Sequence, residues 1–264
     1  MRRLIKVIIY IFAIVGFMFV FVYVALELGW TKTTGIIDNQ HDYFKNQLNN
    51  DAWKKSKEWL ILKEAIKKEA EIINKVSEET GVPSRVIVMP LMVEQLRLFT
   101  SEREIFKQIF APLKILGNQS QFSWGVMGIK QDTGKQIEEN LKNPKSVWYL
   151  GKKFEHILDF KTDNHDNERF ERLTDENNRY YSYLYGALYI KQIEQQWKNA
   201  GFSIKDRSEI IATLYNIGFE NSKPKVNPQS GGAKIEINGG EYSFGSLAQA
   251  FYNSDELIEE FKKQ

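Results

Sequence analysis

One carboxylate in this chain stands where a charge is least expected. Glu94 directly follows residues 86–93, a run of Val, Ile, Met and Leu broken only by one Pro. A helix of this composition is apolar on nearly every side and should be buried, whereas Glu is rarely buried without a partner. Apolar surroundings raise the pKa of a carboxyl group, so Glu94 is a candidate general acid. The alternative is that the helix surfaces here, and that Glu94 is solvated or paired with Arg97.

A second stretch combines glycine with polar and aromatic side chains. Residues 123–131 read Ser-Trp-Gly-Val-Met-Gly-Ile-Lys-Gln, and Gly125 and Gly128 are three positions apart. Glycine lets a backbone approach a ligand closely and adopt positive φ angles. The stretch is therefore a candidate ligand-binding turn, with Ser123 and Trp124 as candidate cleft residues. An ordinary turn between two helices, with the Trp in the core, is the alternative.

A third stretch, residues 212–218, reads Ala-Thr-Leu-Tyr-Asn-Ile-Gly. Here Tyr215 offers an aromatic face and Asn216 an amide, groups suited to an N-acetyl sugar. The alternative is a buried aromatic residue and a helix end at which Gly218 adopts the left-handed conformation.

In this order, the three stretches resemble the lysozyme-like lytic transglycosylases, the family that includes the soluble lytic transglycosylases and goose-type lysozyme. That family has a helix ending in a catalytic Glu, a glycine-rich turn and a later Ala-x-Tyr-Asn-x-Gly segment. The resemblance spans about residues 51–218, excluding 159–178. It implies cleavage of the bond between N-acetylmuramic acid and N-acetylglucosamine in peptidoglycan, with Glu94 as the catalytic residue. It implies substrate-binding roles for Gln95, Ser123, Trp124, Gly125, Gly128, Gln131, Tyr189, Tyr215 and Asn216.

The chain departs from the family pattern near its catalytic position. Gln95 replaces the usual Ser, Pro90 lies one turn before Glu94, and Gly125 follows at a longer interval than usual. Gly186 to Tyr189 is the better of two matches to a Gly-x-x-Tyr-Leu element. The departures favour an alternative function, an envelope protein of the same fold that binds glycan or a partner without cutting. If the protein cuts, Glu94 should point into a groove formed by the other two stretches.

The outcome of cleavage depends on whether a second carboxylate activates water. Glu102, Glu104 and Asp132 are within reach of Glu94 in sequence, and each is better explained as a helix-start or surface charge. We therefore expect the C6 hydroxyl of the substrate to attack, which gives 1,6-anhydro-N-acetylmuramic acid ends. A hydrolytic muramidase with two carboxylates is the alternative.

The N-terminal region predicts a membrane anchor. Val7 to Leu26 is a 20-residue run without charge, about 30 Å as a helix, and Arg2, Arg3 and Lys6 precede it. The positive-inside rule places the N-terminus in the cytoplasm and the rest outside the cytoplasmic membrane. A cleaved signal peptide is the rival, although residues 25–29 match a cleavage site poorly. We expect an anchor over 1–30, a tether over 31–50 and one domain over 51–264.

Composition narrows the choice of partners. Of 36 Lys and Arg residues three precede residue 30, and of 34 Asp and Glu residues one does, so the remainder carries 33 of each. Such a balance gives no basic face for nucleic acid. The chain has no Cys, and His41, His156 and His165 are far apart, so we expect no disulfide, metal or cofactor. The expected partners are peptidoglycan strands, the membrane and an envelope protein complex.

The surrounding pattern predicts a mainly α, lysozyme-like domain with one small β-hairpin at about 233–243, around Asn238-Gly239. Residues 159–178 are strongly charged and are interpreted as a solvated insertion. Helices are expected over 51–80, 85–98, 134–141, 146–158, 180–197, 206–215 and 246–261.

Overall fold

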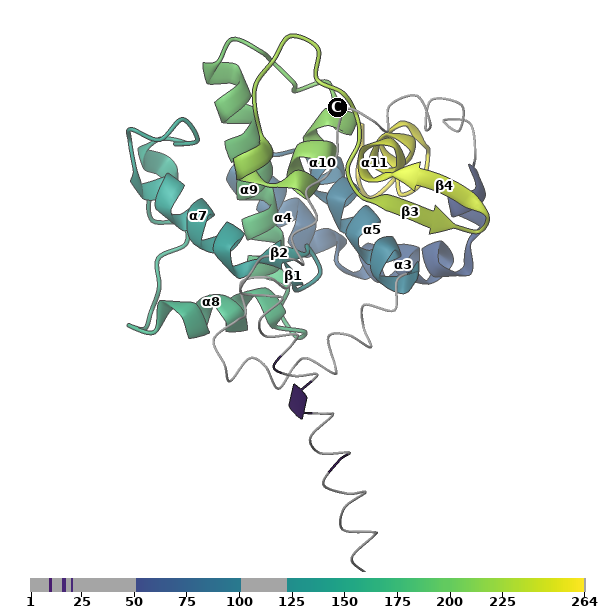
Figure 1. The fold of residues 1–264 in the computed structure, drawn as a ribbon, viewed down its shortest axis with the longest axis horizontal. Coiled ribbons are helices and arrows are strands. Elements are labelled where there is room, and N and C mark those ends of the chain that lie inside the picture. The colour runs from purple at the N-terminus through teal and green to yellow at the C-terminus, as the bar shows by residue number, and fades with distance from the viewer. Residues whose placement is uncertain (1–9, 11–15, 18–19, 21–50, 101–122, 264) are drawn as a thin grey trace, which may run out of the picture.

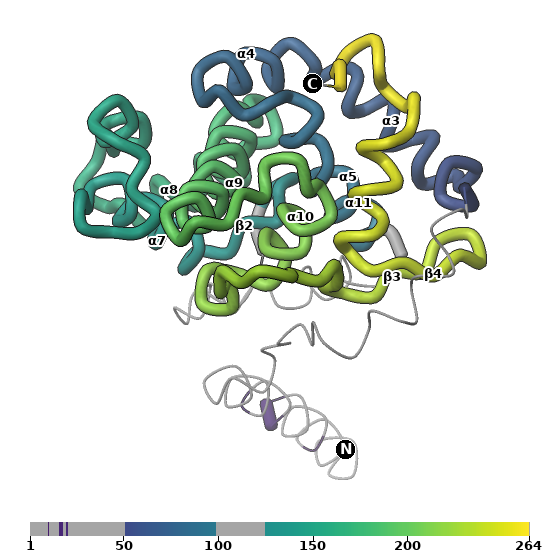
Figure 2. Tube along the Cα trace, turned by 90° about the horizontal axis from the view of Figure 1, so that it is seen from above, coloured from purple at the N-terminus to yellow at the C-terminus, as the bar shows by residue number. Residues whose placement is uncertain are grey.

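The computed structural model describes residues 10, 16, 17, 20, 51–100 and 123–263. Within these residues the chain is mainly helical, with eight α-helices and two short two-stranded sheets. Helices α9 and α10 lie between α7 and α8 on one side and α3, α11 and the β3–β4 hairpin on the other (Figures 1 and 2). In chain order the elements are η2 (Asp51–Lys55), α3 (Lys57–Lys68), α4 (Ala70–Thr80), α5 (Ser84–Thr100), β1 (Ser123–Trp124), β2 (Ile129–Lys130), α7 (Gln131–Lys142), η5 (Lys152–Phe154), α8 (His165–Thr174), α9 (Tyr180–Asn199), α10 (Ser208–Ile217), η6 (Phe219–Asn221), β3 (Lys234–Ile237), β4 (Gly240–Ser243) and α11 (Phe244–Asn253).

Helix α5 packs against most of the other α-helices. It contacts α3, α4, α9, α10, α11 and β3. No apolar residue between Val86 and Val93 is more than 6% exposed, so the prediction of a buried apolar helix is confirmed. The helix continues through Pro90. Because neighbours surround it, α5 needs no polar face, which explains its apolar composition.

The helix predicted over 51–80 is divided into three elements. Ser56 caps α3 by accepting a hydrogen bond from the Trp59 N–H, and Gly81 ends α4 at φ 72°. Between them the helix breaks at Glu69, where the sequence contains no glycine or proline. The Glu69 carboxylate binds Arg179, at 2.9 Å, so the break coincides with a tertiary contact.

The predictions of two helices were wrong: one α-helix does not form, and another is shorter than predicted. Residues 146–158 form turns and the short η5, and Gly151 adopts φ 96°. Helix α11 ends at Asn253 instead of continuing to residue 261. Arg85 of α5 donates hydrogen bonds to carbonyl groups in the last turn of α11 and in the turns that follow it. These acceptors lie 166 or more residues after Arg85 in the sequence.

Most residues of the charged segment 159–178 are exposed, as predicted, but some of its charges are buried. The segment contains α8, and the Arg169 side chain is only 3% exposed. Arg169 donates two hydrogen bonds of 2.6 Å to Glu138 of α7, which also accepts one from the Tyr185 hydroxyl of α9. The charges of α8 therefore join three helices. A run of charged residues does not reveal such pairing, because the partners are distant in sequence.

The predicted hairpin is confirmed. Strands β3 and β4 pair antiparallel, with Ile237 opposite Gly240. Asn238 and Gly239 form the turn with φ values of 50° and 78°, as the favoured two-residue hairpin turn requires. Ile235 and Ile237 are buried on one face, so the hairpin covers part of the core.

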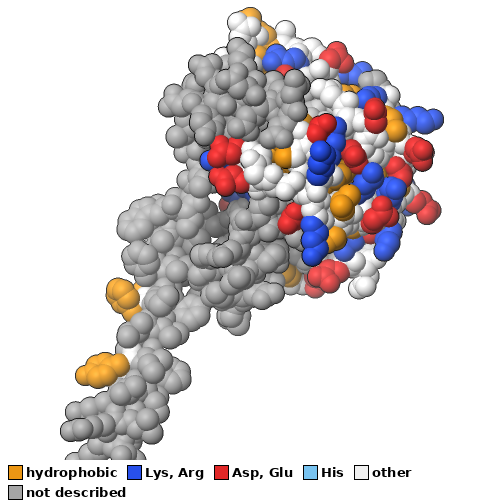
Figure 3. Space-filling view, turned by 90° about the vertical axis from the view of Figure 1, so that its right-hand side faces the viewer, with side chains coloured by type: hydrophobic (Ala, Val, Ile, Leu, Met, Phe, Trp, Pro, Cys, Tyr) orange, Lys and Arg blue, Asp and Glu red, His pale blue; other side chains and the backbone are white. Residues whose placement is uncertain are grey.

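The surface carries both signs of charge. On the face shown in Figure 3, Lys and Arg side chains are interspersed with Asp and Glu. Within the described residues, no helix is long and apolar enough to cross a membrane. The predicted anchor over 1–30 lies outside the described residues except at four positions, and the tether over 31–50 lies entirely outside them.

Candidate functional site

Glu94 lies in the last part of α5 and is 4% exposed. Its Oε2 accepts a hydrogen bond from Arg97 Nη2 at 2.6 Å. Within the part of the chain that the structure describes, Arg97 is the one residue that donates a hydrogen bond to this carboxylate. Glu94 is thus buried, as the apolar run predicts, and also paired with Arg97, as the alternative predicts, while its role as a general acid stays a prediction.

The glycine-rich stretch folds as a tight turn against Glu94. Strand β1 pairs with β2, and residues 125–128 connect them. Gly125 and Gly128 have φ values of 61° and 65°, which favour glycine. A Cβ atom at Gly128 would lie 2.9 Å from Cδ of Glu94, and one at Gly125 would lie 1.9 Å from the Leu173 carbonyl oxygen. Both glycines are therefore required by the protein's own packing.

Two side chains hold this turn in place from opposite sides. Gln95 Nε2 of α5 donates to the Val126 carbonyl at 2.7 Å, and the Tyr215 hydroxyl of α10 donates to the Met127 carbonyl at 2.8 Å. Burial, and after it the negative charge of Glu94, raises the pKa of Tyr215. The structure thus brings the three stretches of the sequence together around one carboxylate.

Tyr189 and Asn216 lie in the wall behind the turn. The Tyr189 ring is 2% exposed and packs on Tyr215 and Phe219, at centroid distances of 4.9 and 4.6 Å. Asn216 Oδ1 accepts a hydrogen bond from the Ala233 N–H at 2.9 Å. Both residues contact protein in this structure, and their roles in substrate binding stay predictions.

The remaining predicted residues are only partly described. Ser123 and Trp124 form β1, but their side chains lie outside what the structure describes, as do Glu102 and Glu104. Gln131 begins α7, is half-buried and interacts with Asp166 of α8. Asp132 is exposed in the first turn of α7, as predicted for a helix-start charge.

A pocket of about 300 Å³ opens beside Gln95, the residue that follows Glu94. Gln95, Gly125 and Val126 form one side of it. The other side comes from the segment joining α8 to α9 and includes Asp175 and Glu176. Glu94 itself is absent from the described lining, so the groove expected at its carboxylate is not seen among the described residues. The full described lining is Gln95, Leu98, Gly125, Val126, Leu173, Thr174, Asp175, Glu176 and Arg179.

Sequence reasoning missed Asp175 and Glu176 as neighbours of the site. Both residues belong to the charged segment 159–178 of the sequence. Their charge does not reveal that they lie next to Gly125 in the fold. No three His, Asp or Glu side chains converge to hold a metal ion within residues 51–100 and 123–263. The arrangement offers one buried carboxylate for proton transfer and a polar pocket for a ligand.

No protein-family model, curated protein or solved structure matches this chain. A function must therefore be inferred from the residues and their geometry.

Proposed function

We propose that this protein is a membrane-anchored lytic transglycosylase that cleaves the glycan strands of peptidoglycan. Glu94 is the catalytic residue, and the N-terminal segment holds the domain outside the cytoplasmic membrane. The fold in this proposal is the lysozyme-like one that the three motifs resemble. One observation carries the proposal: three stretches far apart in sequence meet around a single buried carboxylate, against which only a glycine fits at position 128.

The supporting chemistry begins with Glu94 as a general acid. A protonated Glu94 donates its proton to the glycosidic oxygen as the bond to the anomeric carbon breaks. The resulting carboxylate then accepts the proton of the substrate's C6 hydroxyl, whose oxygen bonds to the anomeric carbon. Arg97, at 2.6 Å, stabilises the carboxylate between the two steps. The attack is intramolecular, so it has a large proximity advantage over attack by water.

The test is mass spectrometry of the products formed when the detergent-purified full chain digests peptidoglycan. We expect 1,6-anhydro-N-acetylmuramic acid ends, each lighter by one water than a hydrolysis product. Reducing N-acetylmuramic acid ends would show a muramidase, with Asp175 and Glu176 as its first candidate second carboxylates. The absence of any cleavage product would contradict the proposed activity.

A second candidate is a non-catalytic protein that binds glycan strands or an envelope partner. The ion pair between Arg97 and Glu94 favours it, because Arg97 already occupies Oε2 of the only proposed catalytic carboxyl group. Co-sedimentation with intact peptidoglycan separates the candidates. A binding protein would sediment with the polymer and release no fragments, whereas an enzyme would release them.

A further inference from the structure

The outward side of α3 carries an exposed apolar pair. Leu60 and Ile61 are 56% and 53% exposed, whereas Trp59 and Leu62 of the same helix are buried in the core. Among the described side chains of residues 51–263, Leu60 and Ile61 are the one pair of large apolar neighbours in sequence that are both exposed. Single exposed apolar side chains are common on protein surfaces, but an adjacent pair indicates a contact surface.

The pair belongs to a groove of about 590 Å³ along α3. Six residues of α3 line it at intervals of three and four, so they share one side of the helix. These six residues, called the α3 face below, are Lys57, Leu60, Ile61, Glu64, Ala65 and Lys68. The face is apolar in its middle and has a lysine at each end, the pattern of a helix that lies on a lipid surface.

The two end lysines of the α3 face are available to a partner. Glu64, the acidic residue of the face, pairs with Lys67 at 3.6 Å. Among the described residues, no acceptor binds the ammonium group of Lys57 or of Lys68. The face therefore carries two cations that the described part of the protein does not satisfy, and it suits an anionic partner.

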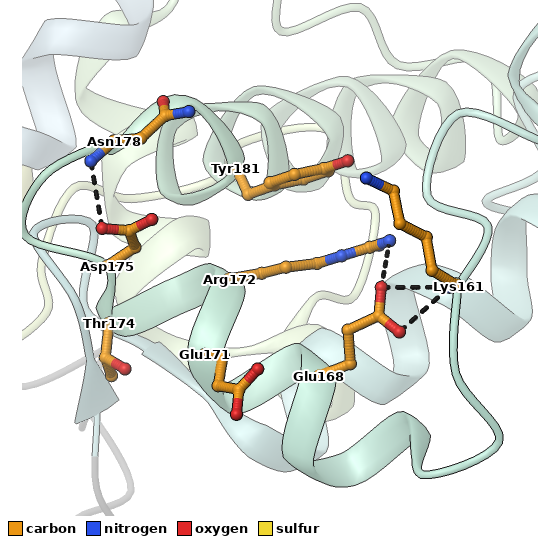
Figure 4. A pocket seen from close by; sticks show the side chains of 8 residues that line it. All are labelled: Lys161, Glu168, Glu171, Arg172, Thr174, Asp175, Asn178 and Tyr181. Carbon is orange, nitrogen blue, oxygen red and sulfur yellow. Dashed lines mark hydrogen bonds and ion pairs between the residues drawn. The ribbon is translucent and has the colours of Figure 1, made fainter.

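A pocket of about 470 Å³ between α8 and the start of α9 shows the opposite arrangement (Figure 4). Its Arg172 guanidinium lies between the rings of Tyr181 and Phe160, at 4.4 and 4.9 Å from their centroids. The same group pairs with Glu168 at 2.6 Å. The protein itself satisfies this cation, so the pocket gives no comparable indication of a partner.

The proposed anchor brings one anionic partner close to the α3 face, namely the membrane. In the sequence, 24 residues separate Leu26, at the end of the apolar run, from Asp51, at the start of η2. A chain of this length reaches at most about 80 Å. The anchor therefore holds the domain near the bilayer at a high effective concentration. A contact that is too weak to bind a membrane by itself is then sufficient.

We propose that the α3 face docks on the surface of an anionic lipid bilayer. Leu60 and Ile61 enter the headgroup region, and the two end lysines contact lipid phosphates. The inference rests on the anchor in the proposed function and is independent of glycan cleavage. Arg179 lines both this groove and the pocket beside Gln95, so docking holds that pocket next to the membrane.

The experiment uses the full chain, reconstituted in lipid vesicles and carrying one spin label. Because the chain has no Cys, Ile61→Cys creates a single labelling site. Val147→Cys is the matched control, since Val147 is 49% exposed and follows α7, which α9 and α10 separate from α3 (Figures 1 and 2). The vesicles contain phosphatidylcholine with or without phosphatidylglycerol. Electron paramagnetic resonance measures how often each label collides with oxygen and with a water-soluble nickel complex, and circular dichroism checks the fold.

In the anionic vesicles, the label at position 61 should lie about 5–10 Å below the lipid phosphates, while the label at position 147 stays in water. Lys57→Gln and Lys68→Gln should each lower the ratio of docked to free protein by about fivefold, and Lys145→Gln should leave it unchanged. Higher salt should lower the ratio as well, because it screens exposed charges.

Three results would overturn the inference. In the first, the nickel complex reaches the label at position 61 as readily as the label at position 147. In the second, docking is equal in the two lipid mixtures, which excludes a role for anionic lipid. In the third, dipolar coupling between labels at position 61 shows that a second copy of the chain covers the face.

A separate measurement distinguishes this inference from the proposed function. If alkaline carbonate extracts the full chain from membranes, the proposed anchor fails, and co-sedimentation of the extracted chain with anionic vesicles decides on the face. Sedimentation that is weakened by Leu60→Ser and not by Val147→Ser supports the inference. No sedimentation, or the same weakening in both variants, overturns it.

Discussion

Helix α5 carries a buried charge at each end, and the two charges differ in how they are satisfied. Arg85, near its start, is 0% exposed, and all five of its N–H groups donate to backbone carbonyls. Glu94, near its end, is 4% exposed and accepts one hydrogen bond from a described residue. The acceptors of Arg85 are the carbonyls of Phe251, Tyr252, Ser254, Glu256 and Phe261, at 2.7–3.1 Å.

This difference separates a structural charge from a candidate catalytic one. Burial lowers the pKa of Arg85, yet its bonds hold the turns that follow α11 against α5, and no donor is left for a ligand. Among the described residues Arg97 alone donates a hydrogen bond to Glu94, and Gly128 lies close to its carboxylate. A buried carboxylate with so few described partners is costly for stability, so it suggests a function.

Replacing Glu94 should give the largest change in activity. Glu94→Gln keeps an oxygen for Arg97 but removes the proton-transfer group, so glycan cleavage should fall by about 10²–10⁴-fold. The free energy of unfolding should fall by about 1–3 kcal/mol, because a buried charge-assisted bond becomes a neutral one. Product release and urea unfolding measure the two effects, and Glu139→Gln on exposed α7 surface is the control. Wild-type activity in Glu94→Gln would show that Glu94 is not the catalytic group, so its role would not differ in kind from that of Arg85.

Replacing Arg85 should give the largest change in stability. Arg85→Met removes five hydrogen bonds to backbone carbonyls in the interior, so urea unfolding should show a loss of about 3–5 kcal/mol. Activity per folded molecule should persist, because Glu94 is not touched. Lys63→Met is the control, since Lys63 makes a partly exposed ion pair with Glu256 at 2.8 Å, worth about 1 kcal/mol or less. An equal loss in the two variants would argue against a special role for Arg85.

A methyl group at position 128 should damage activity more than stability. Gly128→Ala costs about 1–2 kcal/mol from its positive φ, and its Cβ would also displace the Glu94 carboxylate. Gly201→Ala is a close control, because Gly201 has φ 85° and no atom lies within 4 Å of the place that a Cβ would take there. Unfolding should be similar in both variants, while cleavage should fall only in Gly128→Ala. Equal activities would show that Glu94 does not need this contact.

Removing the Gln95 side chain tests how firmly the turn is held. Gln95→Ala loses the bond to the Val126 carbonyl, which is worth about 1 kcal/mol, and should lower cleavage several-fold by loosening the turn. Gln195→Ala, which loses an exposed bond to Asn199 on α9, is the control. Kinetics on glycan strands measure the effect. The same loss of activity in both variants would exclude a positioning role for Gln95.

Low pH should reduce the free energy of unfolding through Glu168, whose carboxylate oxygens accept several hydrogen bonds within the protein. Burial alone would raise the pKa of Glu168, but the N–H groups of Lys161 and Thr162, the Thr162 hydroxyl and Arg172 together lower it to about 2. A lowered pKa contributes stability above the unfolded value of 4.5, and this stability is lost as pH falls from about 4.5 to about 2.

The expected contribution of Glu168 is on the order of 1 kcal/mol after screening by solvent. Urea unfolding of the wild-type protein and of Glu168→Gln across this pH range measures it. The variant should lose less stability on acidification than the wild-type protein does. Parallel curves for the two proteins would show that the hydrogen bonds of Glu168 add no stability.

The sequence predicted best where a pattern acts over a few residues. The apolar run before Glu94 predicted a buried helix, and Asn238-Gly239 predicted a hairpin, because periodicity and turn conformation are local properties. The break at Glu69 and the end of α11 were not predictable in this way. Each coincides with a contact to a residue far along the chain, Arg179 in one case and Arg85 in the other.

The sequence by itself determined which residues are able to do chemistry: one Glu after an apolar run, two glycines and a Tyr-Asn pair. Only the tertiary structure decided what each of them contacts. It placed Gly128 against Glu94, turned the Tyr215 hydroxyl toward Met127 and brought Asp175 beside Gln95. The physical reason is that side-chain identity and local backbone preference are properties of single residues and their immediate neighbours in the sequence. Burial, pairing and pocket shape depend on how distant helices pack.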